Sequence, residues 1–407
     1  GMMVQSTPVS FGAVGTPIVV GVTAGLDRTG ISEQLAAQGS SWEMFYHLVT
    51  SKVALTHAAA GILMPLLMCC MLTRFFGRNK SWREGLEVAP FALFTGVAFV
   101  IPYALAGIFL GPEFPSLIGA LAGLTIVVPA ARAGFLMPKN NWDFAPADTW
   151  PASWMGSIQI RLDSLTTQRP MPVALAWLPY VLLAVLLVLS RAIAPVKAFF
   201  LSVLNFSWKD ILGEQGVSGG IELLYLPGGV MALVVILTFF LHRMSFGQLK
   251  AAVSESSRTL FGAGFVLIFT VPMVRILINS GVNAADLPSM PIAMAQLVSD
   301  TFGSIYPFFA PVVGALGAFI AGSNTVSNLM LAQFQFSTAE LLGASTISLV
   351  AVQAVGAAAG NMIAIHNVVA ASATVGLLGR EGRTLRMTIL PTLYYLVAAG
   401  IISLLIA

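Results

Sequence analysis

Long apolar runs recur along this sequence, and they limit its fold more than any other feature. A helix needs ~20 mostly apolar residues to cross the hydrocarbon core of a bilayer. Only 9% of the 407 residues are charged, whereas a soluble domain carries roughly 25%. The runs that are long enough lie at about 53–73, 88–110, 116–136, 173–194, 222–241, 259–279, 302–321, 341–360, 362–379 and 388–407. The sequence therefore predicts an all-α polytopic transmembrane helical bundle of about 10 spans plus broken or re-entrant segments, and it excludes an ordinary soluble enzyme.

The basic residues are sorted between loops, which predicts the orientation of the chain. Lys and Arg concentrate in cytoplasmic loops because they resist translocation. Most of the 20 Lys and Arg residues lie in four segments: 74–87 with Arg74, Arg78, Lys80 and Arg83; 132–172 with Arg132, Lys139, Arg161 and Arg169; 242–258 with Arg243, Lys250 and Arg258; and 380–386 with Arg380, Arg383 and Arg386. We expect these four segments to face the cytoplasm. The net charge of +3 leaves no basic footprint for a nucleic acid.

The alternation of loops rich and poor in Lys and Arg constrains the topology of one segment. It is preserved only if 322–336 enters and leaves on the cytoplasmic side, so this segment is predicted to be a re-entrant hairpin, with the C-terminus outside. The predicted organisation is a broken polar half-helix segment at 1–25, transmembrane spans at 26–136, a cytoplasmic connector at 137–172, transmembrane spans at 173–321, the re-entrant hairpin at 322–336 and C-terminal spans at 337–407.

Metal, cofactor and nucleotide chemistry find no support in the sequence. The two cysteines, Cys69 and Cys70, are adjacent within an apolar run and cannot form a disulfide framework. The sequence contains no CxxC or HExxH zinc pattern and no GxxxxGK(S/T) nucleotide loop. We therefore expect no cofactor, no bound metal and no ATP-driven transport within this chain.

The densest polar cluster inside an apolar region begins the predicted hairpin. It comprises Gly322, Ser323, Asn324, Thr325, Ser327 and Asn328. Unwound backbone at membrane depth is tolerated only where it is buried in protein or lines a cavity. Hydroxyl, amide and freed backbone N–H groups at such a point can bind a small polar solute. The alternative is that these small polar residues hold helices together.

A second broken segment lies at the N-terminus, where Pro and Gly interrupt an apolar run. Its candidate substrate-binding residues are Ser6, Thr7, Ser10, Gly12 and Thr16. At an offset of 317, Ser6, Val9 and Ser10 align with Ser323, Val326 and Ser327. Transporters with internal repeats often carry interrupted segments at corresponding positions of two halves. The alternative is a Pro-kinked span with no substrate role.

Ionisable and amide side chains inside apolar runs are candidates for a proton or anion path. These are Arg275, His366, Asn361, Asn367 and His57. Histidine titrates near neutral pH, and ionisable groups at membrane depth are costly unless they have partners. A guanidinium matches a carboxylate, but Arg275 and Arg191 can equally extend to the interface. His57 and Glu222 can equally sit at helix ends.

Three blocks in order carry a family resemblance that covers nearly the whole chain. They read PVSFGAVGTPIVVG, AGSNTVSNLMLAQFQ and GNMIAIHNVVAASATVGLLGREGRTLRMTILP. With them the sequence resembles the L-lactate permease family of the ion-transporter superfamily. The resemblance implies a multi-pass permease of the bacterial inner membrane, not an enzyme, that carries lactate, and in relatives glycolate, by symport with a proton. It also implies that Ser323, Asn324 and Thr325 hold the substrate carboxylate.

The sequence departs from that family at its N-terminus and leaves alternatives open. Family members carry further spans and a motif of the form EGAAGFGAP ahead of the first block, so we expect this chain to be N-terminally truncated relative to them. A non-transporting remnant is one alternative. An intramembrane enzyme that uses His57 or His366 is disfavoured, because nucleophilic catalysis needs an adjacent, oriented base. The preference between lactate and glycolate, coupling to H⁺ or Na⁺ and assembly as a homodimer are left open.

Overall fold

The computed structural model describes most of the chain as two compact units. The described residues are 2–26, 28–37, 39–140, 142–146, 149–151, 154, 171–208, 219–254, 256–257, 269, 272–273, 276–277, 279–375, 377 and 379–407. The first unit combines residues 1–159 with 270–407, and the second comprises 160–269. The predicted span at 259–279 lies largely outside the described residues, and so does much of the predicted connector at 137–172.

The first unit is helical, and its helices begin and end where Pro, Gly or capping residues occur. Its first part contains η1 (Val9–Phe11), α1 (Gly12–Thr16), the π-helical η2 (Pro17–Val22), α2 (Arg28–Ala37), α3 (Trp42–Gly61), α4 (Met64–Phe76), α5 (Trp82–Leu86), α6 (Ala89–Phe109) and α7 (Pro115–Arg132). Its second part contains η6 (Asn279–Gly281), α12 (Met290–Phe302), η7 (Gly303–Ile305), α13 (Tyr306–Ala321), α14 (Asn324–Leu342), α15 (Thr346–Gly360), α16 (Ile365–Thr374) and α17 (Glu381–Ile406). Proline begins several of these helices, where its missing N–H costs no hydrogen bond.

The second unit contains the only strands among the described residues. Helices α8 (Val173–Ala192), α9 (Ala194–Ser202) and α10 (Pro227–Leu241) accompany β1 (Asn205–Trp208) and β2 (Gly219–Glu222). The strands pair antiparallel, with Asn205 opposite Glu222. Strand β2 ends at Glu222 and a turn follows at 223–226, so the helix in the run predicted as a span at 222–241 has only 15 residues.

The all-α membrane bundle predicted from the apolar runs is confirmed. Seven segments among the described residues are long and apolar enough to cross a membrane: Trp42–Phe76, Ala89–Phe109, Pro115–Arg132, Val173–Arg191, Met290–Ala321, Thr346–Ser372 and Glu381–Ile406. Their outer faces carry large exposed apolar side chains such as Phe109, Leu124 and Leu405. Exposed apolar surface of this extent is typical of a lipid-facing protein.

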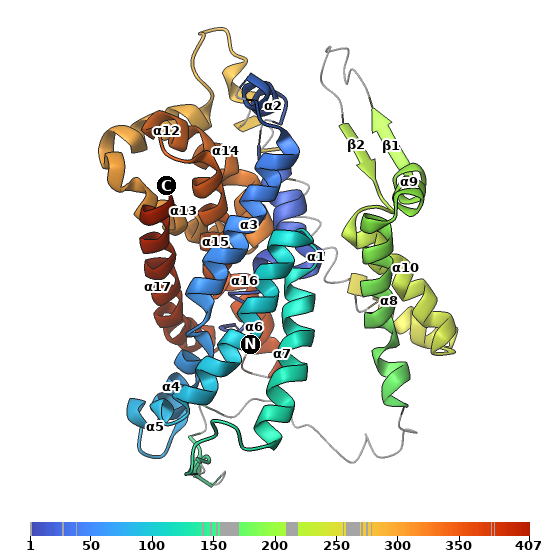
Figure 1. The fold of residues 1–407 in the computed structure, drawn as a ribbon, viewed down its shortest axis with the longest axis vertical. Helices are drawn as coiled ribbons and strands as arrows, with labels where there is room; N and C mark the ends of the chain where they lie inside the picture. The colour runs from blue at the N-terminus through green and yellow to red at the C-terminus, as the bar shows by residue number, and fades with distance from the viewer. Residues whose placement is uncertain are drawn as a thin grey trace. The chain divides into compact units, whose positions relative to one another are not determined.

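Helix α15 is the centre of the first unit. Every residue from Ser348 to Gly360 is buried, and α3, α13, α14 and α17 surround the helix (Figure 1). Small residues allow this close approach, as is usual between helices in membranes. At Gly356 a Cβ would stand 1.9 Å from the carbonyl oxygen of Pro311 on α13. Glycine is therefore required where α13 and α15 touch.

Helices α13 and α14 form an antiparallel hairpin, which corrects one predicted boundary. The chain reverses at Gly322 and Ser323, and Gln335 Nε2 donates to the carbonyl oxygen of Ala310 (3.2 Å) across the two arms. The sequence prediction placed the whole hairpin inside 322–336. That extent is wrong, because α14 contains neither Gly nor Pro and continues unbroken from Asn324 to Leu342.

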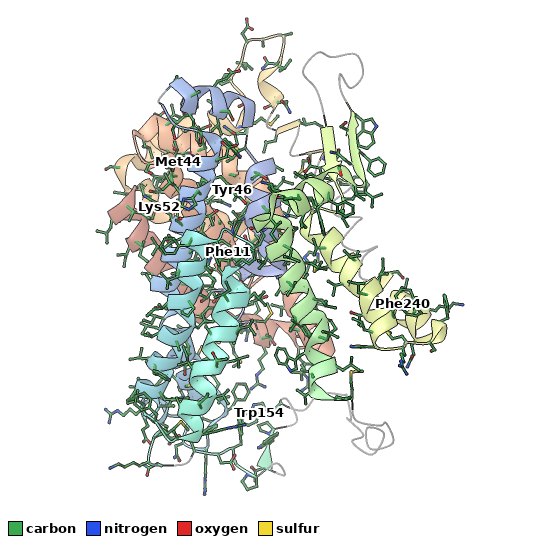
Figure 2. All side chains as sticks on the ribbon, turned by 45° about the vertical axis from the view of Figure 1, so that its right-hand side comes forward. Phe11, Met44, Tyr46, Lys52, Trp154 and Phe240 are labelled. Atoms are coloured by element: carbon green, nitrogen blue, oxygen red, sulfur yellow. The ribbon has the colours of Figure 1, made fainter. Side chains whose placement is uncertain are left out.

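The hairpin opens toward the end of the unit that is remote from the basic loops. Tyr306 at the start of α13 shares an apolar cluster with Leu349 at the start of α15. At the same end Ser348 Oγ donates to the carbonyl oxygen of Ile406 (2.6 Å), and Lys52 Nζ donates to both groups; Figure 2 labels Lys52. The basic loop before α17 lies at the other end (Figure 1). The prediction that the hairpin enters from the side of the basic loops is therefore wrong.

The physical reason is that two predicted spans form a single crossing. Helices α15 and α16 are separated only by a short break at 361–364, and together they run antiparallel to α17. Thr346–Ser372 is accordingly one candidate span, whereas the sequence prediction had separate spans at 341–360 and 362–379. Removing one crossing between the hairpin and the basic loop at 380–386 reverses the side from which the hairpin enters.

This topology predicts opposite accessibility for two exposed positions. In a background with Cys69 and Cys70 replaced by alanine, Asn79→Cys should react with an impermeant maleimide only from the cytoplasmic side, because it lies in a basic loop. Glu340→Cys, at the open end of the hairpin, should react only from the outside. Labelling of intact cells and of inverted vesicles tests both. Labelling of Glu340→Cys from the cytoplasmic side would contradict the orientation of the hairpin.

Candidate functional site

Four interruptions of the helices lie close together inside the first unit. They are the N-terminal turn and η1–α1 at 2–16, the α3–α4 break at 62–63, the hairpin turn at 322–323 and the α15–α16 break at 361–364. Helix ends leave backbone N–H and C=O groups without intrahelical partners. The N-terminal segment contacts the start of α14 and the α15–α16 break across more than 300 sequence positions, through Ser10–Asn324 and Gln5–Asn361. Together these segments define the candidate site.

The hairpin turn presents the N-terminus of α14. Gly322 adopts the left-handed conformation (φ 72°), and Ser323 caps the helix by accepting the Val326 N–H. Gly322, Ser323 and Thr325 are partly exposed, whereas Asn324 is buried. A Cβ at Gly322 would stand 2.5 Å from Nδ1 of His366, so the histidine ring lies against the glycine. The positive end of the helix dipole and a histidine therefore meet at this turn.

Asn324 joins the hairpin to the N-terminal broken segment. Its Nδ2 donates to Ser10 Oγ (3.3 Å), and its Oδ1 accepts from Asn328 Nδ2 (3.0 Å). Asn328 Nδ2 also donates to the carbonyl oxygen of Pro17 (3.1 Å). Asn328 Oδ1 is buried with no hydrogen-bond partner. Ser10, Asn324 and Asn328 were all predicted from the sequence, and the structure brings them together.

His57 extends the same chain of hydrogen bonds. It is fully buried on α3, with Nε2 2.8 Å from Ser10 Oγ and Nδ1 2.6 Å from Tyr395 Oη. The Tyr395 hydroxyl also lies 3.3 Å from Thr7 Oγ1, and Tyr103 donates to the Thr7 carbonyl oxygen (2.8 Å). A polar path therefore runs from the hairpin turn through His57 to Thr7.

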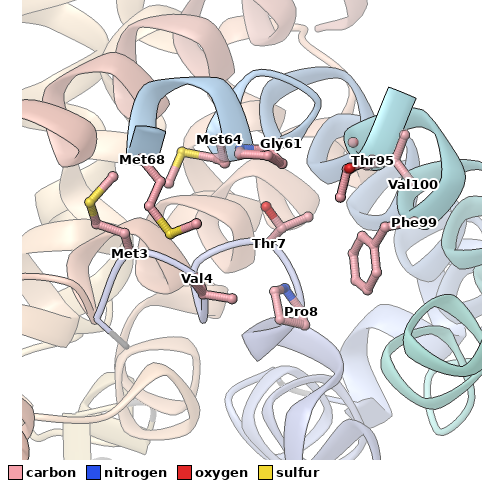
Figure 3. Close-up of a pocket in the computed structure, with 12 residues that line it drawn as sticks. Met3, Val4, Thr7, Pro8, Gly61, Met64, Met68, Thr95, Phe99 and Val100 are labelled. Atoms are coloured by element: carbon pink, nitrogen blue, oxygen red, sulfur yellow. The ribbon is translucent and has the colours of Figure 1, made fainter. Parts of the chain in front are cut away.

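Thr7 borders a cavity of about 270 Å³. Figure 3 shows this cavity between the N-terminal segment, the α3–α4 break and α6. Its lining is mostly apolar and consists of Met3, Val4, Thr7, Pro8, Gly61, Met64, Pro65, Met68, Thr95, Gly96, Phe99 and Val100. Thr7 thus gives the cavity a polar contact next to the buried chain of hydrogen bonds.

The α15–α16 break contributes amide groups on the other side of the N-terminal turn. The Asn361 carbonyl oxygen accepts from Gln5 Nε2 (3.3 Å) and Asn367 Nδ2 (3.4 Å). Asn361 Oδ1 is buried without a partner. Because His366 lies against Gly322, this break and the hairpin turn face each other. Asn361, Asn367 and His366 therefore lie near the predicted hairpin residues.

Other predicted residues lie differently or outside the described chain. Ser6 donates to the Met3 carbonyl oxygen (2.9 Å), whereas Ser323 caps a helix, so the two serines do not play corresponding roles as the repeat alignment suggested. Gly12 and Thr16 begin and end α1. Arg275 lies outside the described residues. In the second unit Arg191 donates to the Tyr225 carbonyl oxygen (3.0 Å) and stacks on its ring.

A buried polar network that was not predicted from the sequence lies beside the site. Gln335 Nε2 donates to Gln353 Oε1 (3.0 Å), and Tyr306 donates to Gln335 Oε1 (2.8 Å). Gln353 Nε2 donates to Ser327 Oγ (3.2 Å), which in turn donates to the Gly314 carbonyl oxygen (2.8 Å). Ser327, predicted as a substrate ligand, thus serves to fix α14 to α13 and α15. The signal available was two glutamines within otherwise apolar helices.

Comparison with known proteins identifies the family. A family model described as L-lactate permease matches residues 1–407. The chain belongs to the L-lactate permease family. It is 29% identical over 415 residues to a Haemophilus influenzae protein that carries the L-lactate permease name, with 98% of this chain and 70% of that protein covered. No solved structure matches the chain significantly.

The similar proteins include permeases named for two different substrates. The chain is 27% identical over 443 residues to the L-lactate permease of Bacillus subtilis, with 99% of this chain and 70% of that protein covered. It is 25% identical over 437 residues to the glycolate permease GlcA of Escherichia coli, with the same shares covered. Membership of this permease family and the apolar helices place the chain in the bacterial inner membrane as a multi-pass protein.

The glutamine network predicts non-additive losses of stability in this permease. Gln335→Leu and Gln353→Leu each leave a buried hydrogen-bonding group unpaired, which should cost about 1–3 kcal/mol. The double variant should lose clearly less than the sum, because it removes both partners of the 3.0 Å bond together. Unfolding in detergent measures the cycle. Strict additivity would contradict a direct bond between the two amides.

Proposed function

We propose that the chain carries a small monocarboxylate such as L-lactate or glycolate across the membrane in symport with a proton. The observation that carries this proposal is the meeting of the helix interruptions, where Asn324 at the start of α14 contacts Ser10 in the N-terminal broken segment. Broken helices of this kind place polar groups around a solute at membrane depth. The names of the L-lactate and glycolate permeases that match the chain support the substrate class.

The start of α14 has the chemistry that a carboxylate needs. The first N–H groups of a helix have no intrahelical acceptor, and the helix dipole favours an anion there. Ser323 and Thr325 are partly exposed and add hydroxyl donors beside the buried Asn324 amide. These groups would bind the carboxylate, while His366 and the amides of Asn361 and Asn367 would complete the site.

A neutral site of this kind favours co-transport of a proton. No Asp, Glu, Lys or Arg is among the buried side chains in the described part of the chain. A carboxylate entering such a site brings an uncompensated negative charge, which is costly in a low dielectric. A proton bound nearby offsets that charge. Coupling to Na⁺ is the competing outcome, and it is distinguished by whether a pH gradient or a sodium gradient drives uptake.

L-lactate and glycolate differ by one methyl group, and one methylene in an apolar pocket is worth only about 1–3 kcal/mol. A carrier for one of them should therefore also accept the other. The alternatives, a non-transporting remnant and an intramembrane enzyme, predict no accumulation of substrate.

Uptake by the purified chain in proteoliposomes tests this proposal. Labelled L-lactate should accumulate when the lumen is alkaline relative to the outside. Asn324→Ala should lower the initial rate at least tenfold, since a hydrogen bond to a charged group contributes about 1.5–3 kcal/mol. Asn79→Ala, in an exposed loop, is the matched control and should behave as wild type. Absence of accumulation by the wild-type chain, or an unaffected Asn324→Ala, would contradict the proposal.

A further inference from the structure

His57 is the one basic side chain that is buried in the described part of the chain. The His57 side chain has 0% of its surface exposed, and no Asp, Glu, Lys, Arg or other His in the described residues is buried. Polar groups bond both of its ring nitrogens, so it is not merely a packed aromatic ring. A buried histidine without an acidic partner, at the junction of the interrupted helices, is an unusual arrangement for a structural residue.

The hydrogen bonds determine the neutral tautomer. Ser10 has a single hydroxyl proton, which it donates to the Ala354 carbonyl oxygen (3.1 Å). Ser10 Oγ must therefore accept from both Asn324 Nδ2 and His57 Nε2. With its proton on Nε2, the neutral imidazole accepts at Nδ1 from the Tyr395 hydroxyl, 2.6 Å away. Every partner of the neutral ring is then satisfied.

The same partners also accommodate the protonated ring. When Nδ1 gains a proton it donates to Tyr395 Oη, and the Tyr395 hydroxyl turns to donate to Thr7 Oγ1, 3.3 Å away. Nε2 keeps its bond to Ser10. The hydroxyls of Tyr395 and Thr7 both reorient, and with that change the partners of the ring accommodate either protonation state of His57.

We propose that His57 is the residue that carries the symported proton, an inference that rests on the proposed function. In this proposal a hydronium ion that enters the cavity bordered by Thr7 (Figure 3) delivers the proton and leaves as water. Thr7 Oγ1 accepts this proton and passes its own hydroxyl proton to Tyr395 Oη, and Tyr395 passes its hydroxyl proton to His57 Nδ1. Each hydroxyl again carries one proton, and the imidazole has gained one proton and one positive charge.

Substrate binding and protonation favour each other in this arrangement. The ionisable groups that face the His57 ring are the phenols of Tyr395 on α17 and Tyr103 on α6, with ring centroids 5.7 Å and 6.3 Å away. The contact from η1 is Ser10, which in turn donates to the Ala354 carbonyl oxygen on α15. None of these carries a compensating negative charge at neutral pH. The carboxylate of the substrate, bound beyond Ser10 at Asn324, would supply it. Linkage then requires that protonation strengthen substrate binding equally.

Two transport modes of the reconstituted chain separate this role from a structural one. Counterflow exchanges labelled L-lactate for unlabelled at equal pH and needs no net proton movement. Accumulation driven by a pH gradient needs it. In His57→Gln, whose amide can still bond Ser10 but cannot hold a proton, counterflow should persist at saturating L-lactate with a raised half-saturation concentration, while pH-driven accumulation and lactate-dependent proton uptake disappear. A structural role would impair both modes alike.

A second pair of variants tests the relay independently of the histidine. Tyr395→Phe removes the hydroxyl next to Nδ1 and should slow pH-driven uptake at least tenfold relative to counterflow. Tyr394→Phe is the matched control, because that hydroxyl donates to the Ala60 carbonyl oxygen and does not touch His57. Proton-coupled accumulation in His57→Gln would overturn the inference. If His57→Gln does not fold, equal transport by Tyr395→Phe and Tyr394→Phe would overturn it instead. A wild-type chain without counterflow would instead refute the proposed function itself.

Discussion

Backbone groups at a helix interruption inside a membrane must find partners within the protein, and the first unit depends on that constraint. Water is absent from the bilayer core, so an unpaired N–H or C=O there costs several kcal/mol. The interruptions at 2–16, 322–323 and 361–364 lie close together, and Gln5 in the first satisfies the Asn361 carbonyl oxygen in the third. Asn324 and Gln5 each bridge two of these segments by a side-chain amide. The hydrogen-bonding groups that stay unpaired are available to a solute.

The buried polar groups divide into two sets with different properties. The network of Gln335, Gln353, Tyr306 and Ser327 is self-satisfied and therefore fixes the hairpin against α13 and α15. By contrast, two buried side-chain oxygens have no partner: Asn328 Oδ1 beside Asn324, and Asn361 Oδ1 at the α15–α16 break. A rigid support beside an incompletely satisfied site is the arrangement that a binding site needs.

The sequence predicted the class of fold because bilayer thickness imposes a length on apolar runs. Local polar clusters also singled out Ser10, Asn324 and His57, and the structure brings the three side chains together; their roles in transport stay predictions. Loop charges could not predict the entry side of the hairpin, since a break such as 361–364 looks the same in sequence whether the chain reverses or continues. Gln335 and Gln353 were missed because their role arises from contacts between helices, which a single helical segment does not reveal. The predicted role of Arg275 stays a prediction.

The central claim is that the carboxylate binds where the start of α14 meets the N-terminal broken segment. An experimental structure of the chain with bound L-lactate tests it most directly. The account predicts the carboxylate within hydrogen-bonding distance of the Ser323–Thr325 turn, with Ser10 still adjoining Asn324 and the substrate within one hydrogen-bonded step of His57. A substrate bound away from this turn, with Ser10 and Asn324 separated, would contradict the account.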